Sequence, residues 1–147
     1  MNHNMRLLVL SIFFFSFSFA QAQVKKILHQ SFEIEGIDNV KLDFAGGYDI
    51  VAWAGNSILI ETNIELYSAS RDIYNHFKKE GRYDVAADTA INLINLRSVD
   101  KERKPIRTSK GECFEIVRVR ILIPEDFNIM NKTTLARKEP SFKLSDQ

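Results

Sequence analysis

The chain has few of the residues on which disulfide-stabilised, metal-binding and cofactor-binding proteins depend. Cys113 is the single cysteine, so no internal disulfide can form, and its position beside apolar residues predicts a buried free thiol. After residue 22 the histidines are His29 and His76, without the H-E-x-x-H spacing that places two imidazoles on one zinc ion. The G-x-S-x-G turn of serine hydrolases and the phosphate loop G-x-x-x-x-G-K-S/T are also missing. We therefore expect no enzyme, no bound metal and no cofactor.

An excess of one charge is also missing. The chain has 20 Lys and Arg against 19 Asp and Glu, and the first 22 residues contain only one of them, Arg6. The rest of the chain is formally neutral, so it has no global field that would attract the phosphates of a nucleic acid. Nucleic acids are therefore not expected as partners.

One long apolar run is present, and it lies at the start of the chain. It extends from Leu7 to Phe19, follows the positive charge of Arg6 and precedes the small residues of Ala20-Gln21-Ala22. This order is typical of a secretory signal peptide, residues 1–22, that is cleaved before Gln23. At about 13 residues the run is shorter than the roughly 20 needed to span a bilayer. We expect export to the periplasm or the outer cell surface, with no integral membrane span after cleavage.

The strongest strand signal in the remaining chain is the stretch Cys113–Pro124. Apolar residues alternate with polar ones in it, and proline ends it because proline has no N–H to give to a strand ladder. One face is expected to carry Val117, Val119, Ile121 and Ile123, and the other Arg118 and Arg120. We expect this stretch to be the central strand of one β-rich domain over residues 23–130.

Shorter alternating segments precede the central strand. After a polar lead-in at residues 24–30, they lie at Phe32–Glu35, Val40–Phe44, Tyr48–Trp53 and Ile58–Leu66. Turn residues separate them, and the pair Gly46-Gly47 accepts the positive φ of a tight hairpin at no steric cost. The pattern predicts an antiparallel meander or the start of a β-roll or solenoid.

The periodicity changes after this meander and predicts one short helix at about residues 70–80. Ser68 and Ser70 are candidate N-caps, and Gly81 is placed to end the helix. Beyond it, residues 91–96 predict a strand with a bulge at Leu93-Ile94. Residues 98–112 predict a solvated hairpin loop, with a functional insertion as the alternative.

Two surfaces are candidates for binding a protein or glycan partner. Tyr48 and Trp53 flank turns, where exposed rings would stack on a sugar or a partner side chain; core packing is the alternative. Arg118 and Arg120 project from the central strand and would receive an acidic partner; cross-strand pairing with Glu or Asp is the alternative.

Glu33 and Glu35 lie two residues apart on one strand, about 7 Å from each other by strand geometry. That spacing resembles the paired carboxylates of hydrolases, although alternating acidic residues are also typical of a half-exposed strand. Together with Trp53 they support a second hypothesis, a secreted hydrolase or carbohydrate-binding accessory domain.

Several segments together resemble the N-terminal part of an adhesin family of unknown function, the head-domain β-solenoids exported by Gram-negative bacteria. The resemblance covers about residues 32–129 and is carried by Phe32–Gly36, Asn39–Leu42, Tyr48–Asn56 and Val117–Pro124. It implies a right-handed β-roll without catalytic residues. We therefore expect an exported, non-enzymatic interaction module, adhesin-like and acting at the cell surface or in the periplasm.

The end of the chain departs from that family. Residues 131–147 show almost no alternation, where the family continues with further stacked strands. We therefore expect a disordered polar tail and, as a third hypothesis, a truncated member without independent function. Packing of Leu135, Phe142 and Leu144 into the core would contradict this expectation.

Overall fold

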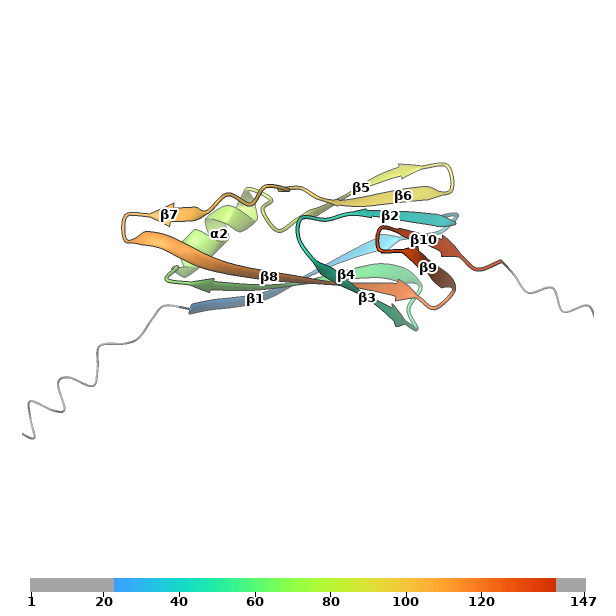
Figure 1. The fold of residues 1–147 in the computed structure, drawn as a ribbon, viewed down its shortest axis with the longest axis horizontal. Helices are drawn as coiled ribbons and strands as arrows, with labels where there is room; N and C mark the ends of the chain where they lie inside the picture. Colours follow the sequence, from blue (N-terminus) through green and yellow to red (C-terminus); the bar gives the residue numbers. More distant parts are fainter. Residues whose placement is uncertain (1–22, 140–147) are drawn as a thin grey trace, which may run out of the picture.

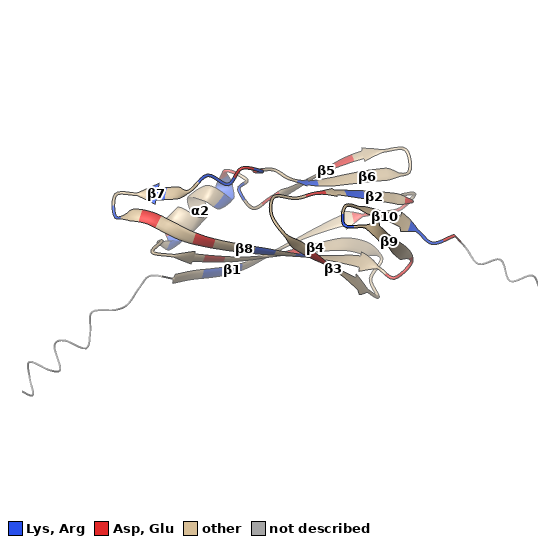
Figure 2. Cartoon of the chain, in the orientation of Figure 1, with Lys and Arg blue, Asp and Glu red and all other residues tan. Residues whose placement is uncertain are grey.

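The computed structural model describes residues 23–139, which form two β-sheets and one helix (Figure 1). In chain order the elements are β1 (Gln23–Glu33), β2 (Asn39–Asp43), β3 (Tyr48–Trp53), β4 (Ser57–Tyr67), α2 (Arg71–Lys79), β5 (Val85–Ala90), β6 (Leu93–Ser98), β7 (Ile106–Thr108), β8 (Gly111–Pro124), β9 (Phe127–Asn131) and β10 (Thr134–Arg137). The prediction of a mostly β fold with one short helix is confirmed. Figure 2 shows acidic and basic positions interspersed along both sheets, in keeping with the neutral composition.

Sheet A has the strand order β1-β4-β8-β3, and the short β7 pairs with the beginning of β8. β8 lies between β4, to which it is antiparallel, and β3, to which it is parallel. It is therefore an interior strand, as predicted from its alternation. Val119, Ile121 and Ile123 are at most 4% exposed on its inner face, so the predicted faces of β8 are confirmed there.

Sheet B has the strand order β5-β6-β2-β10-β9 and packs face to face on one half of sheet A (Figure 1). Its strands are antiparallel to their neighbours except β2 and β6, which are parallel. The core between the sheets is made of alternate residues from both inner faces, as in other β-sandwiches. It includes Val40, Leu42, Ile94, Leu96 and Leu135 from sheet B and Ile58, Ile60, Val119, Ile121 and Ile123 from sheet A.

The other half of sheet A is covered by α2 and β7 (Figure 1). The three long strands β1, β4 and β8 have 11, 11 and 14 residues, so they extend beyond the short strands of sheet B. The apolar residues under the helix form a second core cluster, made of Ile64, Leu66, Ala69, Tyr74, Tyr83, Ile106 and Cys113. The inner face of sheet A is therefore covered by sheet B over one half and by α2 and β7 over the other.

The helix begins and ends as the sequence predicts. The Ser70 hydroxyl accepts a hydrogen bond from the Ile73 N–H at 3.3 Å, which makes it the N-cap. Gly81 has φ +77° just after the last turn, a conformation that glycine adopts without strain. Ser68 has another role, because its carbonyl accepts a hydrogen bond from the buried Cys113 thiol at 3.1 Å.

The predicted antiparallel meander is wrong. β2, β3 and β4 do not pair with one another: β2 belongs to sheet B, while β3 and β4 belong to sheet A with β8 between them. The Gly46-Gly47 pair carries the chain from one sheet to the other instead of closing a hairpin. Alternation on both sides of a glycine pair predicts strands, but it contains no information on their partners.

Residues 24–30 are part of β1 and not a polar lead-in. The polar Lys26 and Gln30 lie on the same face as Val24, Leu28 and Phe32, so they hide the alternation of that face. Gln30 is satisfied there, because its amide accepts from the Val85 N–H at 2.9 Å and donates to the Val85 carbonyl at 3.2 Å.

Two further local predictions need correction. The predicted bulge at Leu93-Ile94 is not present; a hairpin turn lies two positions earlier, with Asn92 at φ +57° and Ile91 93% exposed at its tip. The solvated loop at residues 98–112 contains β7, and its Ile106 is only 2% exposed. In both cases a single apolar residue in a polar stretch gives a misleading signal.

The predicted boundary at residue 130 is also wrong. β9 ends at Asn131, and β10 follows within the stretch expected to be a tail. Leu135 of β10 is 0% exposed in the sandwich core and pairs with Val40 of β2. Phe142 and Leu144 lie outside the described residues. One buried leucine among polar neighbours is too little periodicity to identify this strand from sequence.

A buried ion pair lies where the two core clusters meet. Arg82, between α2 and β5, is 5% exposed and donates to both carboxylate oxygens of Glu115, at 3.0 and 2.8 Å. Glu115 lies on the inner face of β8 and also accepts from the Tyr83 hydroxyl at 2.8 Å. The remaining Arg82 donors reach Asp100 at 3.4 Å and the Lys104 carbonyl at 2.8 Å. This cluster joins the helix and two connections to sheet A.

Burial and charge both act on this cluster. Burial by itself lowers the pKa of Arg82, but its hydrogen bonds and charge pairing with Glu115 outweigh burial and raise that pKa. Burial, followed by the hydrogen bond to Glu115, raises the pKa of Tyr83 far above its usual range. Arg82 is therefore charged and Tyr83 neutral at physiological pH.

Removal of the Glu115 carboxylate is expected to destabilise the fold strongly. Glu115→Ala leaves the guanidinium of Arg82 buried without its main partner, which costs about 3–5 kcal/mol. Glu112→Ala is the matched control, because Glu112 lies on the same strand with its side chain 60% exposed; its loss is expected to be under about 1 kcal/mol. Urea unfolding of both variants measures the difference, and equal losses would contradict a buried role for Glu115.

The two faces of β8 are expected to respond differently to truncation. Ile121 is 0% exposed in the core, so Ile121→Ala is expected to lower the free energy of unfolding by about 2–5 kcal/mol. Arg120→Ala, on the exposed face, is expected to lower it by well under about 1 kcal/mol. Denaturant melts of the two variants provide the test, and similar losses would show that the faces are reversed.

Candidate functional site

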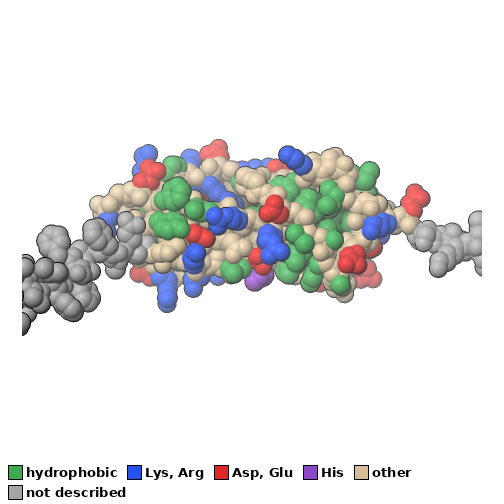
Figure 3. Space-filling model, turned by 60° about the horizontal axis from the view of Figure 1, so that its bottom comes forward, with side chains coloured by type: hydrophobic (Ala, Val, Ile, Leu, Met, Phe, Trp, Pro, Cys, Tyr) green, Lys and Arg blue, Asp and Glu red, His purple; other side chains and the backbone are tan. Residues whose placement is uncertain are grey.

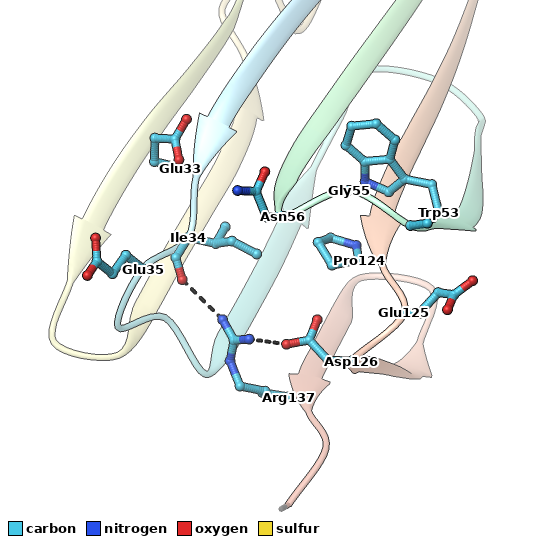
Figure 4. Close-up of a pocket in the computed structure, with 11 residues that line it drawn as sticks. Glu33, Ile34, Glu35, Trp53, Gly55, Asn56, Pro124, Glu125, Asp126 and Arg137 are labelled. Atoms are coloured by element: carbon cyan, nitrogen blue, oxygen red, sulfur yellow. Dashed lines mark hydrogen bonds and ion pairs between the residues drawn. The ribbon is translucent and has the colours of Figure 1, made fainter.

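A hollow of about 610 Å³ opens at one end of the two sheets (Figure 4). We call it the Trp53 hollow. Its walls come from four places in the chain: residues 33–35 at the end of β1, 53–56 between β3 and β4, 124–126 between β8 and β9, and Arg137 of β10. Because these ends meet only when both sheets are formed, the hollow depends on the whole sandwich.

The Trp53 indole is held in one position in this hollow. Its Nε1–H donates to the Ser57 carbonyl at 3.0 Å across the turn that joins β3 to β4. The six-membered ring lies so close to Gly55 that a Cβ there would be 2.2 Å from Cζ2 of the ring. Any other residue at position 55 would displace the indole. The sequence therefore fixes a partly exposed aromatic surface at the edge of the hollow.

Carboxylates give the hollow an acidic character. Glu33 and Glu35 line the side opposite Trp53, and Asp126 lies beside Arg137 at the bottom of the view in Figure 4. Glu125 lies below Trp53 on the right, with its carboxylate directed outward. The hollow also contains the Asn56 amide, a neutral donor and acceptor. Glu33 and Glu35 thus share the hollow with Trp53, as the second sequence hypothesis requires. Within residues 23–139 no group of three or more His, Cys, Asp or Glu side chains is arranged to hold a metal ion.

Arg137 is the cation of the hollow, and its donors are engaged by the protein. It forms an ion pair with Asp126 and donates to the carbonyls of Ile34 at 3.1 Å and Ile37 at 2.8 Å. Its guanidinium carbon lies 4.6 Å from the centre of the Phe127 ring. Arg137 therefore joins β10 to the end of β1, and the residues that line the hollow include four acidic side chains against this one cation.

Tyr48 does not share a surface with Trp53. It lies on the inner face of β3, its hydroxyl donates to the Lys132 carbonyl, and its ring centre is 5.3 Å from that of Phe44. Burial, with the nearby Asp43 charge, raises the pKa of its hydroxyl. Tyr48 therefore packs against the core, which was the alternative to a binding role, and it does not line the Trp53 hollow.

Arg118 and Arg120 lie on the exposed face of β8, opposite Asn63 and Glu61 of β4. Figure 3 shows basic and acidic side chains next to one another in the middle of the face that it views. Arg118 is paired with Glu65 at 3.2 Å and Arg120 with Glu61 at 3.4 Å, both across to β4. From β1, Lys25 approaches Glu65 at 3.5 Å and His29 approaches Glu61 at 3.4 Å. Cross-strand pairing, the alternative to an acidic partner, is therefore what the structure shows for both arginines.

These pairings lower the pKa values of the two β4 carboxyls. The hydrogen bond from Asn63 lowers that of Glu61, with His29 and Arg120 adding to the effect. The hydrogen bond from Tyr67 lowers that of Glu65, and Lys25 and Arg118 act in the same direction. Both carboxylates are solvent-accessible enough for salt to weaken these effects.

Sequence reasoning missed part of the hollow. Glu125 and Asp126 follow Pro124 directly. The end of the central strand at this proline could have identified them as residues of an exposed turn. Arg137 has no such signal, because it lies in the stretch that lacks alternation. Its place in the hollow depends on β10, which only the tertiary structure shows.

No protein-family model, no curated protein and no solved structure matches this chain. Within the part of the chain that the structure describes, no helix has both the length and the apolar character to cross a membrane. The site must therefore be interpreted from its own geometry.

The Glu61 and Glu65 pairings predict an acid-dependent loss of stability. Because folding lowers both pKa values, the two groups stabilise the fold above about pH 4.5, and this stabilisation is lost as the pH falls through the folded-state values. The variant Glu61→Gln/Glu65→Gln is therefore expected to lose less stability between neutral and acidic pH than the parent chain. Urea midpoints measured across this range test the prediction, with Glu112→Gln as an exposed control. An unchanged pH profile in the double variant would contradict it.

Proposed function

We propose that this chain is an exported, non-enzymatic binding domain, an adhesin-like interaction module that acts at the cell surface or in the periplasm. The Trp53 hollow is its ligand site. Export is supported by the signal-peptide pattern of residues 1–22. The observation that carries the proposal is the fixed position of the Trp53 indole at the edge of an open, polar hollow.

A pre-positioned indole favours binding because little conformational freedom is lost when a ligand stacks on it. The ring is held by a hydrogen bond to the Ser57 carbonyl and by close packing on Gly55. Neither contact supplies a catalytic group. A flat aromatic surface with a polar surround takes a ligand that has one apolar face and several hydrogen-bonding groups.

A glycan is the ligand class that the hollow fits best. The apolar face of a sugar ring would stack on Trp53, and the sugar hydroxyls would donate hydrogen bonds to the carboxylate of Glu33 or Glu35. The Asn56 amide offers both a donor and an acceptor in the same hollow. Its volume of about 610 Å³ is within the range of small-ligand sites.

A carbohydrate-processing accessory domain is the second candidate. The observation that favours it is that Glu33, Glu35 and Trp53, which the sequence analysis linked, line one hollow. It differs from the first candidate in one outcome, the cleavage of the bound glycan.

Glycan binding is expected to depend on Trp53 and to be visible in its fluorescence. Trp53 is the only tryptophan in the chain, so the intrinsic emission reports on this hollow alone. A panel of defined neutral and amino-sugar oligosaccharides, screened on an array, is expected to give hits that shift the emission in titration. Trp53→Ala is expected to weaken array binding by about tenfold or more, a loss of about 1.4 kcal/mol or more.

Phe114→Ala is the matched control, because Phe114 is an aromatic residue 65% exposed on β8, far along the strand from Pro124 and the hollow. It is expected to leave binding unchanged. Equal losses in both variants, or an array without any hit, would contradict a glycan site at Trp53. Release of shorter products from a bound oligosaccharide would instead support the second candidate.

A further inference from the structure

Among the strands that end the two sheets, β1 is the one best suited to pair with a further strand. Within residues 23–139, β1, β3, β5 and β9 each have a strand neighbour on one side only. β1 has 11 residues, against six in β3 and β5 and five in β9. It pairs with β4 without a register shift from Gln23 to Glu33 and contains no proline or glycine. Short strands, prolines, bulges and charges protect free edges, and of these devices β1 has only the charges.

The charges of β1 make the strand complementary to itself. Lys25 lies near its beginning and Glu33 at its end, and both are on the outer face of sheet A. Beside a second β1 that runs in the opposite direction, Lys25 of each strand lies opposite Glu33 of the other. A parallel, in-register arrangement would place like charges opposite each other instead. Opposite charges at facing positions stabilise a strand pair and like charges destabilise it, so the pattern favours the antiparallel arrangement.

We infer that two copies of this chain form a dimer by antiparallel pairing of their β1 strands. The register that places Lys25 opposite Glu33 also places His29 opposite itself, so the twofold axis passes there. The two copies of sheet A then form one continuous sheet. The partner's Lys25 lies next to Glu33, which lines the Trp53 hollow, so each copy contributes a residue to the rim of the other's hollow. The dimer goes beyond the proposed glycan binding and does not depend on it.

The other side chains of β1 are compatible with this register. On the outer face, Ile27 lies opposite the small Ser31 of the second copy, and pairing covers part of an isoleucine that is 57% exposed. On the inner face, Lys26 lies opposite Phe32, which packs against the core. An inward lysine ordinarily opposes edge pairing. Here its methylene stem has the partner's phenylalanine ring to lie along, while the ammonium group stays in water.

The neighbouring edge of sheet B leaves room for a second copy. β5 lies beside β1 on this side of the sandwich, because Gln30 exchanges hydrogen bonds of 2.9 and 3.2 Å with the Val85 backbone. The exposed residues of β5 are Ala87–Ala90, all with short side chains. Asp88, the one charge among them, is paired with Arg97 at 2.8 Å. β5 therefore presents no long side chain that would hold a second β1 away.

Sedimentation of the purified chain, residues 23–147, over a series of concentrations tests for the dimer. We expect a reversible monomer–dimer equilibrium with a dissociation constant of about 100 μM or tighter. A chain that stays monomeric throughout this range would overturn the proposal. Species larger than a dimer would also overturn it, because pairing through β1 closes after two copies.

Charge reversal tests whether β1 is the interface. Lys25→Glu and Glu33→Lys each place like charges opposite each other at both symmetry-related positions, and each is expected to weaken dimerisation by about tenfold or more. The double variant Lys25→Glu/Glu33→Lys restores opposite charges, and its dissociation constant is expected to return to within about threefold of the parent value. Within one copy the two residues are about 26 Å apart by strand geometry, so no contact inside the chain can produce this recovery.

Lys41→Glu is the matched control, because Lys41 is exposed on β2, the middle strand of sheet B. It is expected to leave dimerisation unchanged, and circular dichroism melts verify that each variant is folded. Failure of the folded double variant to recover, or equal weakening by Lys41→Glu, would contradict pairing through β1. None of these measurements involves a ligand, so their outcome is separate from that of the glycan screen.

Backbone hydrogen exchange of the parent chain tests the same interface without a substitution. The amides of β1 are expected to exchange more slowly at high than at low protein concentration, whereas those of β3, the other edge of sheet A, are expected to be unaffected. Exchange in β1 that does not depend on concentration across the dimer transition would overturn the proposal. A concentration dependence confined to β3 would do the same.

Discussion

The bidentate ion pair between Arg82 and Glu115 is the interaction on which the two halves of this domain depend. Sheet A is one continuous surface, but sheet B covers one half of it and α2 with β7 the other. Glu115 lies on the inner face of β8 between these covers, and Arg82, Tyr83 and the 100–104 connection converge on it. A buried carboxylate is tolerable only when it is paired and hydrogen-bonded. Glu115 therefore joins the two halves, because it needs both Arg82 and Tyr83 in place.

Strong periodicity made β4, β8 and α2 predictable, but not β1. β8 and β4 alternate over many residues with β-branched side chains inside, and α2 has both a serine cap and a glycine stop. Strand partners were not predictable, because alternation determines which face is buried and not which strand lies beside it. The polar residues that have inward partners, such as Gln30 and Glu115, were invisible for a related reason. Their burial makes sense only once the Val85 backbone and Arg82 are in place.

In the candidate site, too, local features were predictable from the sequence and tertiary partners were not. Trp53 could be chosen from sequence, because an aromatic residue next to a Gly-Asn turn is a local signal. The grouping of Trp53 with Glu33 and Glu35 appeared only as a hypothesis, and the structure places all three around one hollow. Arg137 belongs to β10, which has a single buried leucine, so its contribution could not be predicted. The arginines of β8, which local reasoning also selected, are engaged in cross-strand pairs.

The most direct test of this account is native-state hydrogen exchange at increasing urea concentration, which shows whether the two halves of the domain open together. The central claim is that the Arg82 and Glu115 cluster makes them one cooperative unit. We expect the amides of Ile64, under α2, and of Ile94, in sheet B, to lose protection in the same global opening with the same urea dependence. Loss of protection around Ile64 at a clearly lower free energy would show that the α2 half opens independently, and would contradict the claim.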